Sequence, residues 1–148
     1  MDRRERVARL VDHSKNPLCR GFFEGAEVVM PGGSPECGGS VVIYLKADEA
    51  GEAIEGLSFT GEGDTISMGA ASIIMERVHE ENLSMDEVLE LDYDEFVESL
   101  GREVIGSRTR NATLGLSTLK SAIHKHRRDR RSSAATPGRV QVAENTHS

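Results

Sequence analysis

A change in hydrophobic period near residue 61 divides this chain and limits the folds that it can form. Residues 40–46 (SVVIYLK) are rich in β-branched and aromatic side chains, and residues 53–60 alternate between apolar and polar. Both segments are therefore predicted strands, and the turn sequence DEAGE between them indicates an antiparallel hairpin. From residue 64 onward the apolar residues recur at intervals of three and four, which is typical of amphipathic helices.

The segments before the hairpin add one helix and one strand. Residues 3–13 have apolar side chains at helical spacing, and Asn16 precedes a proline, which disfavours the helical backbone. Residues 26–30 are β-prone, whereas residues 31–35 (PGGSP) are rich in turn formers and are predicted to be a loop. Residues 61–63 (GEG) are predicted to break the strand that precedes them.

The second half of the chain is predicted to be helical. The expected helices cover residues 64–79, 83–91, 92–100 and 111–126. Ser84 with Glu87 matches a capping box, and the small residues at 68–72 would let another element approach the first of these helices closely. Three strands followed by helices predict an α+β fold: a small three-stranded antiparallel sheet with helices packed on one face.

Charge is distributed unevenly along the chain, whose net charge is −7. Residues 21–101 contain nineteen Asp and Glu but only two basic residues, Lys46 and Arg77. Such an acidic surface repels phosphates, so we expect no nucleic-acid partner. Arginines and lysines gather at both ends, and we interpret residues 1–126 as the folded domain and 127–148 as a basic, disordered tail, either solvated or contacting an acidic partner.

The two cysteines, Cys19 and Cys37, are too few for a disulfide framework. Two free thiols are typical of a reducing compartment, so we expect a cytoplasmic protein. The sequence contains no apolar run long enough for a membrane span, and its charged first residues do not resemble a secretory signal. No pattern of residues indicates an enzyme active site.

Three segments contain residues that suit a binding site. Cys37 lies in a glycine-flanked loop, where it would be accessible, but a single thiol does not make a metal site. Asp64 and Asn111 each precede a predicted helix, where a carboxylate or an amide also serves as an ordinary N-cap. For each of the three residues the sequence alone allows two interpretations, a binding-site residue and an ordinary loop or N-cap residue.

Four motifs in order resemble the NifU/IscU family of iron–sulfur cluster assembly scaffolds. Residues 11–17 (VDHSKNP) are similar to the family's "DHY-x-N-P" start, and residues 35–39 (PECGG) to its "P-x-C-G-D" ligand loop. Residues 59–72 (FTGEGDTISMGAAS) resemble "F-x-G-x-G-C-A-I-S-x-A-S-A-S", and residues 108–114 (RTRNATL) resemble "R-x-x-C-A-x-L". The resemblance covers about residues 6–126 and implies an α+β scaffold that assembles a transient [2Fe–2S] cluster on three loop cysteines.

This chain departs from the family pattern at the ligands themselves. Cys37 matches the first ligand, but Asp64 stands at the second and Asn111 at the third, and Gly39 replaces the aspartate of the first motif. Thiolates hold iron–sulfur clusters, whereas one thiolate, one carboxylate and one amide form a harder ligand set. The candidate ligands are nevertheless Cys37, Asp64 and Asn111. The expected cofactor is an iron–sulfur cluster or a single iron or zinc ion.

The resemblance implies a binding protein of iron–sulfur cluster assembly, with a cysteine desulfurase and cluster acceptor proteins as partners. Our first hypothesis is weak or altered binding of iron or a cluster through Cys37 and Asp64. A second is an adaptor or regulator of the assembly machinery that binds no metal. A third is a sulfur carrier that uses Cys37 alone.

Overall fold

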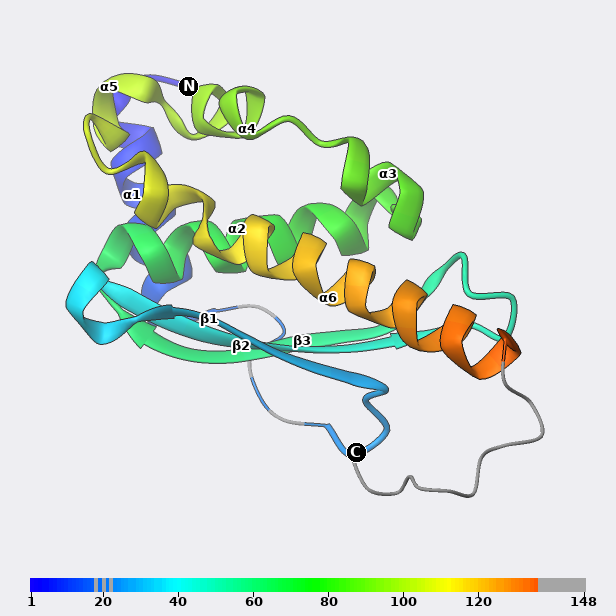
Figure 1. Ribbon diagram of the computed structural model, residues 1–148. Helices are drawn as coiled ribbons and strands as arrows, with labels where there is room; N and C mark the ends of the chain where they lie inside the picture. The colour runs from blue at the N-terminus through cyan, green and yellow to red at the C-terminus, as the bar shows by residue number, and fades with distance from the viewer. Residues whose placement is uncertain (18, 20, 22, 136–148) are drawn as a thin grey trace.

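The computed structural model describes residues 1–135 except residues 18, 20 and 22, and its centre is an antiparallel sheet. Strands β1 (Val28–Ser34), β2 (Gly39–Ala47) and β3 (Ile54–Gly63) are arranged in the order β1-β2-β3. Helices α2 (Thr65–Glu81) and α6 (Thr109–Ala135) cover one face of this sheet (Figure 1). The predicted fold, a three-stranded antiparallel sheet with helices on one face, is confirmed.

Four shorter helices pack around this pair. They are α1 (Arg3–Lys15), α3 (Met85–Glu90), α4 (Tyr93–Leu100) and α5 (Arg102–Ile105). Ser84 and Glu87 form the predicted capping box at the start of α3. The single turn α5 was not predicted, because four residues between glycines are too few to show a helical period. No helix in the described part of the chain is long and apolar enough to cross a membrane.

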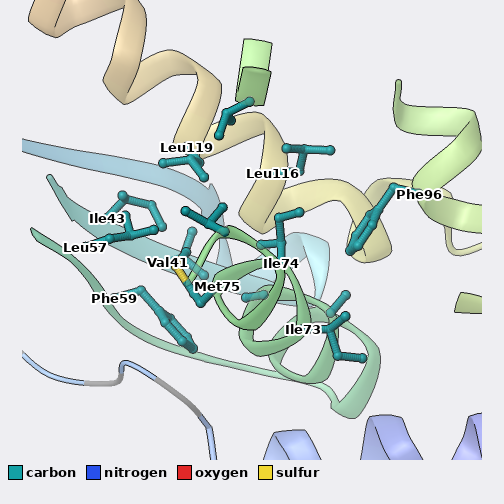
Figure 2. Close-up of a cluster of buried hydrophobic side chains, with 14 of the residues drawn as sticks. Val41, Ile43, Leu57, Phe59, Ile73, Ile74, Met75, Phe96, Leu116 and Leu119 are labelled. Carbon is teal, nitrogen blue, oxygen red and sulfur yellow. The ribbon is translucent and has the colours of Figure 1, made fainter. Parts of the chain in front are cut away.

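The hydrophobic core lies between the sheet and the helix pair. Every second side chain of β2 is buried, as its alternating sequence predicts. Figure 2 shows side chains of the sheet, such as Ile43 and Phe59, facing Ile74 and Met75 of α2 and Leu116 of α6. All five are fully buried. Because these residues come from three separate segments, the core fixes the position of the start of α2 relative to the sheet.

Two predictions about the strands were wrong. Residues 31–35 were expected to be a loop, but Pro31 to Ser34 continue β1 and pair with β2. Proline is tolerated there because β1 is an edge strand, which has one side free of ladder hydrogen bonds. Residues 61–63 were expected to break β3, yet they pair with the first residues of β2.

The small residues in the middle of α2 allow close helix packing, as predicted. A Cβ atom at Gly69 would lie 2.5 Å from the backbone oxygen of Leu10 in α1. Ala71 also approaches α6 closely, since a Cβ at Gly115 would lie 2.9 Å from the Cβ of Ala71. These contacts place α2 between α1 and α6, and they bring the starts of α2 and α6 to the same end of the molecule.

The last helix is longer than predicted. We expected it to end at residue 126, but α6 continues through the basic segment to Ala135. Arg127 forms a 2.8 Å ion pair with Asp86, and Arg130 donates a 2.7 Å hydrogen bond to the carbonyl of Glu49. The basic run thus contacts acidic segments of its own chain, which the one-dimensional sequence could not show. The rest of the predicted tail, residues 136–148, lies outside the described residues.

Candidate functional site

Three segments that are distant in the sequence meet at one end of the sheet. They are the short 3-10 turn η1 (Pro35–Cys37) between β1 and β2, the start of α2, and the start of α6. The amide of Asp64 donates a 2.9 Å hydrogen bond to the carbonyl of Gly38, which ties η1 to α2. Each segment brings one of the three residues that the sequence singled out, namely Cys37, Asp64 and Asn111.

Asp64 caps the N-terminus of α2. Its Oδ1 accepts a 2.7 Å hydrogen bond from the amide of Ser67, as expected for an N-cap. Its Oδ2 accepts a 3.2 Å hydrogen bond from Nδ2 of Asn111 and lies 3.5 Å from Nη1 of Arg108. Both carboxylate oxygens of Asp64 are therefore already engaged by groups of the same chain.

Asn111 is not a helix cap, which was one of the two interpretations that the sequence left open for it. It is the third residue of α6, so it lies in the first turn as predicted, but its side chain points across the site. Its Nδ2, which has two hydrogens to share among them, lies within hydrogen-bonding distance of the carbonyl of Cys37 (3.1 Å), Oδ2 of Asp64 (3.2 Å) and Oγ of Ser67 (3.3 Å). A carbonyl and a carboxylate can only accept, so this arrangement fixes which end of the amide faces the site.

Gly38 is required by this close packing. Its backbone has φ near +99°, a region that side chains disfavour. A Cβ at Gly38 would lie 2.4 Å from Nδ2 of Asn111 and 3.3 Å from Oδ2 of Asp64. The loop that holds Cys37 can therefore approach α2 and α6 only with glycine at this position.

Cys37 is the exposed thiol of the described chain. It borders a hollow of about 260 Å³ that is also lined by Ser67, Arg110 and Leu114. The other cysteine, Cys19, is partly buried, and this burial raises the pKa of its thiol. Because the thiolate is the reactive form, Cys37 is the better placed nucleophile of the two.

The residues at this site do not fit an iron–sulfur cluster or a tetrahedral zinc ion. Clusters and structural zinc sites require several thiolate or imidazole ligands, and Cys37 supplies a single thiolate. Asn111 turns its amino group, which has no ligand lone pair, toward the other two residues. Among the described residues, no three His, Cys, Asp or Glu side chains are grouped so that they could hold a metal ion.

Sequence reasoning missed three residues that shape the site. Gly38, Ser67 and Arg108 appear in the sequence analysis only as parts of motifs. The signal for Gly38 was present, since a glycine after a candidate ligand often indicates a backbone that approaches another group closely. The partners of Arg108 and Ser67 depend on the tertiary fold and left no local signal.

Comparison with known proteins agrees with the resemblance seen in the motifs. The family model described as "NifU-like N terminal domain" matches residues 5–133. The zinc-dependent sulfurtransferase SufU of Bacillus subtilis is 29% identical over 131 residues, covering 78% of this chain and 87% of SufU. The iron–sulfur cluster assembly scaffold protein IscU of Thermotoga maritima is 27% identical over 105 residues, covering 71% of each chain.

A solved structure supports the same fold. The N-terminal part of a nitrogen-fixing NifU-like protein from Brucella abortus superposes with a TM-score of 0.64, covering 84% of this chain and 96% of that one. At 14% sequence identity this likeness concerns the fold alone. The family model, in contrast, spans most of the chain and includes all three segments of the site. This chain therefore belongs to the NifU-like N-terminal domain family, whose relatives include scaffold proteins of iron–sulfur cluster assembly.

Proposed function

We propose that this protein serves iron–sulfur cluster assembly by accepting sulfur on Cys37, and that it does so without holding a cluster. The observation that carries the proposal is the exposed thiol of Cys37 beside a hollow, at a site with no second thiol. A relative that covers most of this chain is named a sulfurtransferase, which supports a role in moving sulfur. A cysteine desulfurase and a cluster acceptor are the partners that this role requires.

The chemistry needs only the Cys37 side chain and a persulfide donor. The thiolate of Cys37 attacks the outer sulfur of the desulfurase persulfide, the donor's S–S bond breaks, and its cysteine leaves as a thiolate. A new S–S bond forms on Cys37, so the transfer consumes no external oxidant or reductant. The guanidinium of Arg110, which lines the same hollow, is placed to attract the anionic donor.

Weak metal binding through Cys37 and Asp64, our first hypothesis from the sequence, has less support. The carboxylate of Asp64 already caps α2 and interacts with Asn111 and Arg108. A metal ion would have to displace these contacts and would gain one thiolate. Because these contacts occupy the carboxylate of Asp64, they also favour a second candidate function. In it, the protein is an adaptor that binds the assembly partners without any chemistry at Cys37.

Mass spectrometry after incubation with a cysteine desulfurase and L-cysteine under anaerobic conditions tests the proposal. We expect the chain to gain the mass of one sulfur atom, and the Cys37→Ser variant to gain none. Cys19→Ser is the matched control, because it removes the other thiol and should be modified like the wild type.

Three outcomes would count against the proposal. Sulfur found on Cys19 would mean that Cys19, and not Cys37, is the sulfur acceptor. A wild-type chain that binds the desulfurase but gains no sulfur would favour the adaptor. Stoichiometric iron in the same protein would instead support the metal-binding hypothesis.

A further inference from the structure

We infer that Asn111 closes this site to metal ions and that its side-chain amino group holds the Cys37 loop in place by hydrogen bonds. This inference concerns the selectivity of the site and does not depend on sulfur transfer at Cys37. It follows from the mismatch between the residues present and the metal groups named for the relatives.

The geometry around Nδ2 of Asn111 is that of a small cation site filled by an amino group. Three oxygen atoms converge on this nitrogen: the carbonyl of Cys37, Oδ2 of Asp64 and Oγ of Ser67, at 3.1, 3.2 and 3.3 Å. Carbonyl and carboxylate oxygens are the ligands that hard divalent cations prefer. The amino group supplies partial positive charge where such a cation would otherwise sit.

The surrounding packing keeps the amino group in this position. A Cβ on Gly38 would lie 2.4 Å from Nδ2, so the Cys37 loop closes over it at van der Waals contact. Asp64 cannot turn away, because its Oδ1 caps α2 through the amide of Ser67. Asn111 thus joins η1, α2 and α6 through the contacts of a single atom.

The near-isosteric substitution Asn111→Asp tests this assignment. It replaces the amino group by a carboxylate oxygen and turns the three converging oxygens into a four-oxygen set. Without metal, we expect a lower melting temperature than in the wild type, because two carboxylates then face each other. With Mn²⁺ at about a hundred times its dissociation constant, we expect a rise of about 5–10 °C. Binding should also reduce the electron paramagnetic resonance signal of free Mn²⁺.

The controls separate this effect from a general change in charge. Ser121→Asp adds the same charge at an exposed position of the same helix and should not respond to Mn²⁺. The wild type should show neither a shift in melting temperature nor loss of the free Mn²⁺ signal. If Asn111→Asp does not fold, Asn111→Cys with Zn²⁺ replaces it, with a gain in melting temperature again expected.

The inference is overturned if the wild type binds Mn²⁺ as tightly as Asn111→Asp does. It is equally overturned if the folded variant shows no response to the ion, since Asn111 would then not be what excludes it. Neither readout involves sulfur, so a failure here is distinct from a failure of persulfide formation on Cys37.

Discussion

At the scale of single residues, the three candidate ligand residues take part in hydrogen bonds within the chain. Asp64 is an N-cap, one of the two interpretations that the sequence left open for it, and the amide that it caps is only three residues away. The role of Asn111 was not predictable in this way, since its partners Cys37 and Asp64 lie 74 and 47 residues from it. The local sequence therefore indicated the cap at Asp64 as one interpretation, and only the fold explains the contacts of Asn111.

The substitution Gly38→Ala tests how tightly these residues pack. We expect it to reduce the free energy of unfolding by about 1–3 kcal/mol, because the new Cβ meets Asn111 and alanine must adopt a backbone conformation that favours glycine. Urea unfolding followed by circular dichroism measures this change.

Gly106→Ala is the matched control for Gly38→Ala. Gly106 also has a positive φ, of +58°, but a Cβ there would meet nothing within 4 Å. This variant carries a backbone cost alone, at its own conformation of φ 58° and ψ −125°. A Gly38→Ala variant that is as stable as the wild type would mean that neither the contact with Asn111 nor the backbone at Gly38 contributes to stability.

At the scale of helices and strands, the hydrophobic period predicted the type of each element well and the residue at which the element ends poorly. β2 and α2 were predicted within two residues at each end, because their apolar patterns are long and regular. The first strand was predicted to end before Pro31, whereas β1 continues to Ser34, because pairing at the edge of a sheet leaves no pattern in the sequence. α6 was ended too early because its last turns are stabilised by Asp86 and Glu49 from other elements.

The hairpin between β2 and β3 is expected to depend on pH through Asp48. Its Oδ1 accepts hydrogen bonds from the amides of Glu52 (2.9 Å) and Ala53 (3.2 Å), and the bond from Glu52 is the main cause of the lowered pKa of Asp48. A carboxyl whose pKa is lower in the folded state stabilises the fold above its unfolded pKa. This stability is lost as the pH falls through the lower, folded value.

We therefore expect Asp48→Asn to be less stable than the wild type at pH 7, with a difference that shrinks as the pH falls below about 4. Unfolding in urea at a series of pH values measures it. Glu49→Gln is the matched control, because it removes the same charge one residue along and leaves the hydrogen bonds to Asp48 in place. A difference between Asp48→Asn and wild type that stayed constant from pH 7 to pH 2 would contradict this account.

At the scale of the whole molecule, the order of the motifs was the most informative feature of the sequence. It predicted that the segments around Cys37, Asp64 and Asn111 would meet, and they do so at one end of the sheet. Composition could not show that the basic end of α6 would contact the acidic turn at Glu49 and the start of α3 at Asp86. The family is thus clear from the order of the motifs along the chain.

The central claim is that this member of the family has exchanged metal ligands for an internal hydrogen-bond network. Anaerobic reconstitution with iron and sulfide, followed by metal and sulfide analysis and absorption spectroscopy, tests it most directly. We predict that the wild type acquires no charge-transfer absorption, while the double variant Asp64→Cys with Asn111→Cys acquires it, because three thiolates then face one another. Two irons and two sulfides bound per wild-type chain would contradict the claim.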